Sequence, residues 1–118
     1  MRAVKHDEEH LQIACVRWFR LQYPHIIIHH SPNGGKRGLL TAIRFKQMGT
    51  IAGFPDLFIA YPAKGFHGLF IEMKNGREGV VSQEQKRMLS ALDGNGYKTI
   101  VVRSFDDFIS AVNDYIRA

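Results

Sequence analysis

The chain has 118 residues, which is enough for one domain with a buried core and too few for two, so we expect a single domain over residues 1–118. Lys and Arg number 16 against 11 Asp and Glu, and the resulting net charge of +5 favours a polyanionic partner, while ordinary hydrophobic and charged contents of 45% and 23% exclude a disordered basic tail. The single cysteine, Cys15, excludes an intramolecular disulfide and a cysteine-based zinc site, and is typical of a reducing, intracellular setting.

The first half of the chain predicts two helices and one strand. The first helix begins at Asp7, which can cap it, and runs to about Gln22, because apolar residues recur there at helical spacing. Residues 26–30 are rich in β-branched side chains and predict a strand. Residues 31–35 have the composition of a loop, and residues 39–48 predict a short helix.

The second half predicts three strands and two helices. Residues 57–60 and 69–74 form strands whose connection indicates an antiparallel hairpin with a long loop. A capping-box sequence opens a helix over residues 82–93, residues 97–102 form the last strand, and Ser104 starts the C-terminal helix. Because the last helix and strand require a crossover, we expect an α/β fold with a mixed four-stranded sheet flanked by helices.

The positive charge is concentrated in the N-terminal part of the chain. Residues 1–50 hold eight basic and three acidic side chains, whereas residues 51–118 hold eight of each. No carboxylate side chain occurs between Glu9 and Asp56. The segment forms either a solvated basic surface or a surface that binds phosphates, and its charge alone does not separate the two.

The sequence gives no indication of membrane association. The longest apolar runs are the size of strands, far below the roughly 20 residues that span a bilayer. The charged start of the chain lacks the apolar core of a signal peptide. We therefore expect a soluble, cytoplasmic protein with no membrane partner.

Two predicted strands bring acidic and basic side chains to one place. Residues two apart on a strand share a face, so Glu72 and Lys74 point the same way and Met73 the other. Asp56 follows Pro55 at the start of the preceding strand and converges with Glu72 if the strands pair. Two carboxylates suit Mg²⁺ or Mn²⁺, which bridge to substrate phosphates, and a nearby lysine can stabilise phosphoryl transfer. The alternative is a weak surface ion pair on an edge strand, but the Pro-Asp pair before an apolar strand favours the metal site.

These residues resemble the signature of the PD-(D/E)XK nucleases, and their surroundings resemble the VRR-NUC branch of that superfamily. The resemblance runs from Glu8 to Tyr115 and rests on five motifs in order: Glu8-x-x-x-Gln12, Pro32-Asn33-Gly34, Gly49-x-x-x-Gly53-Phe54-Pro55-Asp56-Leu57, Ile71-Glu72-Met73-Lys74 and Ser82-x-x-Gln85. It is strongest with the small stand-alone proteins of phages and bacteria. It implies a restriction-endonuclease-like core and a cytoplasmic protein of phage or bacterial origin.

The resemblance assigns roles to the acidic and basic residues. It implies that Asp56 and Glu72 bind the catalytic Mg²⁺ or Mn²⁺ together with the backbone carbonyl of Met73, and that Lys74 is the catalytic lysine. It also implies that Glu8 completes the acidic cluster. Two alternatives stay open. Glu9 could complete the cluster in place of Glu8, or Glu8 could serve only to stabilise the first turn of the helix by its negative charge.

Two glutamines are expected near the same site. Gln12 shares a helical face with Glu8, so it lines the site and we assign it to DNA binding. The resemblance places Gln85 in contact with the catalytic centre. Gln85 is equally well explained as the second half of a capping box with Ser82.

The remaining expected DNA contacts lie in the acid-free segment. Glycines in the loop at residues 31–35 allow a close approach of the backbone to a phosphate, although a plain turn also explains them. Beside a nuclease site, the cations around this loop are better explained as contacts to phosphates than as solvated charges. The full set comprises Asn33, Gly34, Lys36, Arg37, Arg44 and Lys46.

Other chemical groups carry less weight. His29 and His30 are adjacent on a strand and face opposite sides, so they do not form a metal site together and are at most peripheral phosphate contacts. Cys15 is expected in the core, because nothing near it in the sequence would activate a thiolate.

The sequence therefore predicts a metal-dependent nuclease that hydrolyses DNA, acting as a structure-selective endonuclease on branched substrates such as flaps or Holliday junctions. We also expect a homodimer, because cutting both strands with one site per chain requires two chains. The alternatives are a module of the same fold that binds nucleic acid without cutting, a nuclease directed at RNA, and a restriction-type or transposition-associated nuclease. The short chain leaves no room for a separate target-recognition domain, which counts against sequence-specific cutting.

Overall fold

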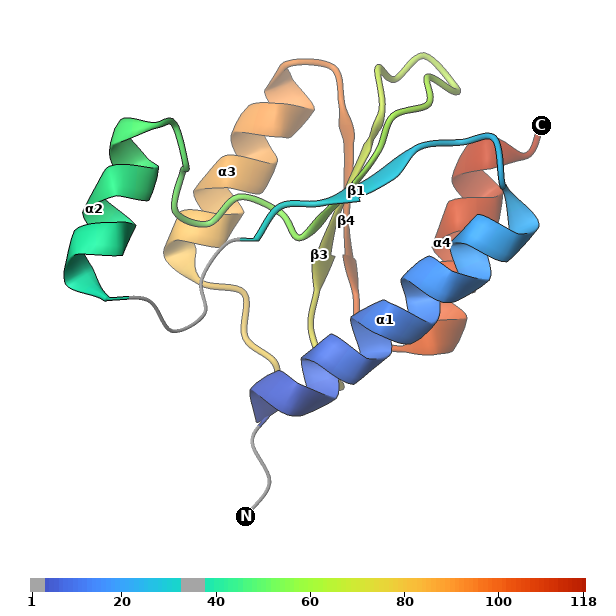
Figure 1. The fold of residues 1–118 in the computed structure, drawn as a ribbon. Coiled ribbons are helices and arrows are strands. Elements are labelled where there is room, and N and C mark those ends of the chain that lie inside the picture. The colour runs from blue at the N-terminus through green and yellow to red at the C-terminus, as the bar shows by residue number, and fades with distance from the viewer. Residues whose placement is uncertain (1–3, 33–37) are drawn as a thin grey trace.

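A computed structural model describes residues 4–32 and 38–118, and these residues form helices and strands in the predicted order (Figure 1). The elements are α1 (Val4–Gln22), β1 (Ile28–His30), α2 (Leu39–Gln47), β2 (Leu57–Ile59), β3 (Leu69–Met73), α3 (Gln83–Gly94), β4 (Lys98–Val102) and α4 (Phe105–Ile116). No helix of the described residues is long and apolar enough to cross a membrane.

The four strands form one mixed sheet in the order β1-β2-β3-β4. β1 and β2 pair antiparallel, β2 and β3 pair antiparallel, and β3 and β4 pair parallel through the α3 crossover. The tip of the β2–β3 hairpin turns at Lys64 and Gly65, which both have positive φ, as a tight hairpin turn requires. The predicted α/β fold with a mixed four-stranded sheet is confirmed, and β3 lies inside the sheet, not at its edge.

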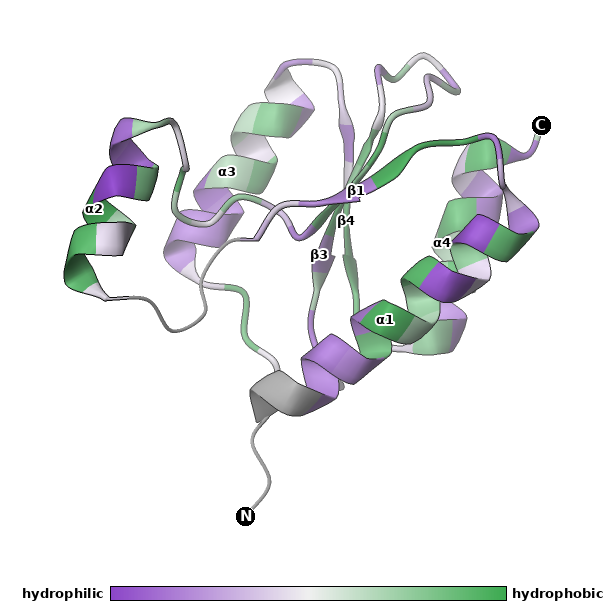
Figure 2. Ribbon diagram, in the orientation of Figure 1, coloured by the Kyte–Doolittle hydropathy of each residue, from purple (hydrophilic) through white to green (hydrophobic). Residues whose placement is uncertain are grey.

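Each face of the sheet is covered by different side chains. On one face, α1 and α4 bury Phe19 and Phe108 against alternate residues of the strands. On the other, Phe70 stacks on Phe58, with ring centroids 4.4 Å apart, beside Tyr97. Figure 2 shows hydrophobic residues along the strands and on α4, as these two apolar layers require. Both faces of β3 are therefore buried, so polar side chains on it are removed from water.

Several predicted boundaries differ from the structure. Residues 60, 74 and 97, which were predicted as strand, lie just outside β2, β3 and β4. Asp7 does not cap α1, because the helix already includes residue 4 and Asp7 lies in its first turn, where a carboxylate still favours the helix dipole. The first strand begins at Ile28 and not at Ile26, because the Ile26 N–H bonds to the Tyr23 carbonyl in a turn that follows α1. α2 ends at Gln47, one residue earlier than predicted.

Candidate active site

The backbone holds Asp56 at the point where three strands begin or end. The Met73 N–H donates to Asp56 Oδ2 at 2.7 Å, and the Ser31 N–H donates to the Asp56 carbonyl at 3.0 Å. Pro55 is buried and fixes the approach of the chain to β2. Asp56 is thus anchored both from the end of β3 and from the residue that follows β1.

Glu72 lies near the end of the central strand β3 and is 2% exposed. Its Oε2 accepts a hydrogen bond from Gln85 Nε2 at 2.9 Å and lies 3.6 Å from Lys74 Nζ. Its Oε1 is also buried, and within the described part of the chain it has no hydrogen-bond partner. A buried carboxylate oxygen without a partner is costly, so this oxygen is available to a ligand that the chain itself does not supply.

The surroundings of Glu72 disfavour its ionised form. Burial and, to a smaller extent, the nearby Asp56 carboxylate raise the pKa of Glu72 to about 8, and Lys74 opposes both effects only in part. Two carboxylates in one buried place repel each other when both are ionised. One ammonium group does not balance them, and a divalent cation would.

The structure places Glu8 within electrostatic reach of Asp56 and Lys74, and Glu9 in solvent. Burial raises the pKa of Glu8. The Asp56 carboxylate also raises it, whereas Lys74 and a hydrogen bond with the Asn75 backbone lower it. Glu9 is exposed on the outside of α1. The helical phase of α1 therefore brings only the first of the two adjacent glutamates toward Asp56 and Lys74.

Gln85 makes both of the contacts that the sequence left as alternatives. Its Oε1 accepts from the Ser82 N–H at 2.9 Å, and Ser82 Oγ accepts from the Gln85 N–H at 3.1 Å, which completes a capping box at the start of α3. Its Nε2 donates to Glu72. One amide therefore fixes the start of α3 to the carboxylate on β3.

Gly53 permits this arrangement of α3. Its φ is +81°, and a Cβ there would lie 2.8 Å from the Glu84 backbone. Only glycine fits where the chain leading to Asp56 passes so close to the first turn of α3.

His30 has a place at the site that the sequence did not predict. His30 Nδ1 lies 2.9 Å from the Asp56 carbonyl oxygen and 3.0 Å from Gln12 Nε2. It pairs with Leu57 across β1 and β2, which sets it directly beside Asp56. Gln12 therefore reaches the site through His30, and the register of the two strands is the feature that would have revealed this contact.

Two of the expected DNA contacts lie on α2. Arg44 and Lys46 are exposed in the last turn of α2, and no residue of that helix is buried. Asn33, Gly34, Lys36 and Arg37 lie outside the described residues.

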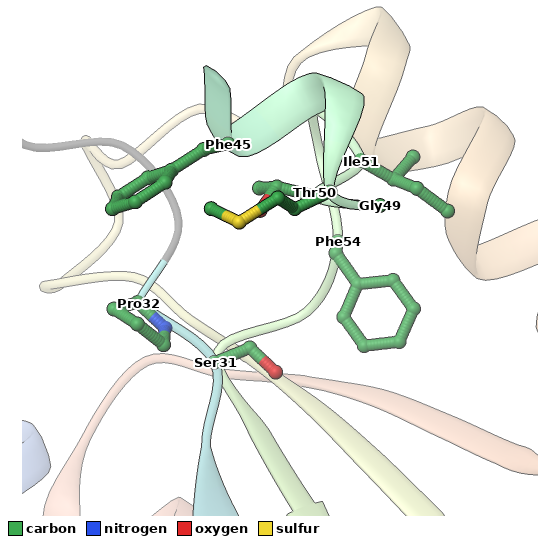
Figure 3. A pocket seen from close by; sticks show the side chains of 8 residues that line it. Ser31, Pro32, Phe45, Gly49, Thr50, Ile51 and Phe54 are labelled. Carbon is green, nitrogen blue, oxygen red and sulfur yellow. The ribbon is translucent and has the colours of Figure 1, made fainter. Parts of the chain in front are cut away.

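An apolar pocket of about 420 Å³ separates α2 from the sheet (Figure 3). Phe45 and Phe54 lie on different sides of it, and Ser31 contributes a hydroxyl group. None of the side chains that line it is titratable. The lining of this pocket therefore offers no acid, base or metal ligand from a titratable side chain, and the titratable Asp56, Glu72 and Lys74 lie outside it.

The donors at the cluster are suited to an open cation site. Among the described residues, no group of three or more His, Cys, Asp or Glu side chains is arranged to hold a metal ion, so Glu8, Asp56 and Glu72 do not form a three-carboxylate site. Mg²⁺ does not need one, since it commonly binds through one or two carboxylates, waters and substrate phosphates. Asp56, the unpartnered oxygen of Glu72 and the Met73 carbonyl fit that type of site.

Comparisons with known proteins agree with this geometry. The VRR-NUC domain family matches residues 4–106. The chain belongs to the VRR-NUC family. A solved structure of a VRR_NUC domain protein superposes with a TM-score of 0.80 at 29% identity, covering 99% of this chain and 91% of that one. A comparison with curated proteins gave no match.

Membership in the VRR-NUC family makes this chain a nuclease-type domain, for which DNA is the implied substrate. The mixed sheet with its flanking helices is consistent with the restriction-endonuclease-like fold. The match includes every element that contributes to the cluster, from α1 with Glu8 to α3 with Gln85.

Proposed function

We propose that this VRR-NUC domain hydrolyses DNA phosphodiester bonds with Mg²⁺ or Mn²⁺, as a structure-selective endonuclease on branched or flapped DNA. The observation that carries the proposal is the buried, unpartnered Oε1 of Glu72 beside Asp56 on a central strand. A weak surface ion pair is the competing explanation of Glu72 and Lys74. It requires exposure at an edge strand, whereas Glu72 is 2% and Lys74 is 9% exposed inside the sheet.

The residues present fit a hard divalent cation. Asp56, Glu72 and the Met73 carbonyl would hold it, and Glu8 would contribute directly or through water. Such a cation supplies a Lewis acid that offsets negative charge on the phosphoryl oxygens and activates water.

The chain contributes positioning and charge. Gln85 donates to one oxygen of Glu72, and the other oxygen, buried without a partner among the described residues, would be free to bind a cation. Lys74 keeps its ammonium group 3.6 Å from Glu72, where it can stabilise negative charge that develops on the scissile phosphate. The Met73 N–H fixes the Asp56 carboxylate, so the site is organised before substrate arrives.

The preference for branched DNA and a homodimer complete the proposal. Contacts to phosphates position DNA without reading its bases, and the exposed Arg44 and Lys46 on α2 would make contacts of this kind to a branched substrate. Each chain has one cluster, so symmetric cutting of a junction requires two chains. Light scattering at working concentration tests the dimer, and a monomer mass contradicts it.

A cleavage panel tests the chemistry. Linear, flap and four-way DNA and a single-stranded RNA are incubated with Mg²⁺, Mn²⁺ or EDTA. We expect cleavage of branched DNA in the metal-containing reactions only. Asp56→Asn should lower the single-turnover rate by at least about 100-fold, because preorganised charge at the reacting centre is worth several kcal/mol.

Glu8→Gln and Glu9→Gln form a matched pair for this panel, because they remove the same charge from adjacent positions. Only Glu8→Gln should slow cleavage, since Glu9 is exposed. Tight binding without cutting by the wild-type protein would indicate the non-cutting module, and cleavage of RNA alone would indicate the other substrate class.

A further inference from the structure

A groove of about 520 Å³ runs beside the C-terminal two thirds of α1, where the helix passes the end of β1. Arg17 and Arg20 line it together with Gln12 and His30, and the apolar Ile13 and Leu21 lie on α1 before and after the two arginines. Within residues 4–32 and 38–118, no carboxylate pairs with either arginine. The groove therefore presents two uncompensated guanidinium groups.

The groove leads to the candidate active site. Gln12 and His30 both line it, and His30 also contacts the Asp56 carbonyl at 2.9 Å. Glu8, at the cluster, and Arg20 are twelve residues apart on one helix, a distance of about 18 Å. At 3.4 Å per step, that length spans about five nucleotides of a B-form strand.

The charge of this face indicates its occupant. A second copy of the chain, related by a two-fold axis along α1, would bring the arginines of both copies together. α1 itself carries no carboxylate after Glu9 that could balance them in such a contact of helix on helix. A phosphodiester backbone supplies one negative charge per nucleotide, and guanidinium groups bind phosphates in a bidentate manner.

We propose that this α1 groove holds the sugar-phosphate backbone of the DNA strand on one side of the scissile phosphate, with Arg17 and Arg20 each contacting one phosphate. In Figure 1, α2 with its basic last turn lies to the left of the strands, and the second half of α1 lies to the right. The DNA therefore crosses the cluster from one basic surface to another. The inference rests on the proposed function, since it takes DNA as the substrate.

The test is metal-free DNA binding, which does not depend on cleavage. The double variant Arg17→Gln/Arg20→Gln and the wild type are titrated into labelled four-way DNA in EDTA, by fluorescence anisotropy, from 50 to 200 mM salt. Because each phosphate contact contributes about 0.9 to the slope of log K against log salt, the slope should become shallower by about 1.8. At low salt the affinity should fall at least about tenfold.

Two further variants separate this groove from charge in general. Lys98→Gln/Arg117→Gln removes the same net charge, with Lys98 at the opposite end of the sheet from Glu72, and should keep the wild-type slope. Arg17→Lys/Arg20→Lys keeps both charges and should restore most of the slope. Circular dichroism checks folding, and because both arginines are exposed we expect native spectra.

Several outcomes overturn the proposal. The proposal is wrong if Arg17→Gln/Arg20→Gln keeps the wild-type slope of log K against log salt. It is also wrong if Lys98→Gln/Arg117→Gln makes that slope shallower by the same amount. Conversion of a dimer to a monomer by Arg17→Gln/Arg20→Gln, with an unchanged slope, would assign the face to a second copy instead. The proposed nuclease activity is tested separately. If the wild type and Arg17→Gln/Arg20→Gln differ in slope as expected but the wild type never cuts DNA, the groove is supported and the nuclease activity is contradicted.

Discussion

Replacing Glu72 by glutamine should stabilise the metal-free protein, and increasingly so as the pH rises. Burial and Asp56 raise the pKa of Glu72 from 4.5 to about 8 in the folded protein. Between these values the folded chain holds a proton that the unfolded chain has lost, so the free energy of unfolding falls as pH rises through this range. Glutamine has nearly the same shape and does not titrate, so it escapes this loss.

The size of the effect follows from the pKa difference. Between pH 5 and pH 9 the wild type should lose up to about 4 kcal/mol relative to Glu72→Gln, at 1.36 kcal/mol per pH unit. For a chain of 118 residues, 1 kcal/mol shifts the melting temperature by about 4 °C. The difference in melting temperature should therefore be small at pH 5 and widen by up to about 15 °C at pH 9.

Differential scanning calorimetry in EDTA from pH 5 to pH 9 measures this difference. Glu78→Gln is the control, because it removes an exposed carboxylate close by in the sequence and should show no widening. With Mg²⁺ at 100 times its dissociation constant, the wild type should gain about 2.7 kcal/mol and Glu72→Gln much less. A difference between wild type and Glu72→Gln that stays constant across this pH range would refute the electrostatic account of the site.

Two further pairs of variants probe the start of α3. In thermal melts, Gly53→Ala should destabilise the protein by about 2–3 kcal/mol, because φ is positive there and a Cβ would lie 2.8 Å from the Glu84 backbone. Gly94→Ala is the control, since the space around Gly94 is open, and it should be neutral or stabilising. Ser82→Ala should cost about 1 kcal/mol of stability and leave single-turnover cleavage nearly intact. Gln85→Glu keeps an acceptor for the Ser82 N–H but loses the donor to Glu72, so it should slow cleavage at least about tenfold. Equal cleavage by these last two variants would mean that Gln85 acts only as a cap.

The order of elements was predictable from the sequence because each has a clear period or capping signal. The beginning of α1 was not, since residues 4–6 have no apolar periodicity and Asp7 is a good cap by type. The beginning of β1 was missed for a different reason. Three consecutive isoleucines favour a strand, but the turn after α1 uses the N–H of the first and leaves Ile27 66% exposed.

The convergence of Asp56, Glu72 and Lys74 was predictable because strand alternation and hairpin pairing are short-range rules. The contact of His30 was not, because it depends on the register between β1 and β2, which are separated by a loop and a helix in the sequence. The double role of Gln85 was also beyond the pattern. The sequence offered two partners for one side chain. In the structure the Gln85 carbonyl oxygen accepts from the Ser82 N–H, and the amide NH₂ donates to Glu72.

The buried Glu72 and Lys74 pair is better explained by function than by stability. Burial makes it costly to ionise Glu72, as its raised pKa shows, and an apolar side chain at that position of β3 would serve the fold as well or better. The pair also leaves one carboxylate oxygen unsatisfied and sets Glu72 close to a second carboxylate. An arrangement that weakens the metal-free fold and is relieved by a bound cation is the arrangement expected of a site whose loaded form is the working one. Metal binding and thermal stability should therefore rise together in this protein, and substitutions that neutralise Glu72 should uncouple them.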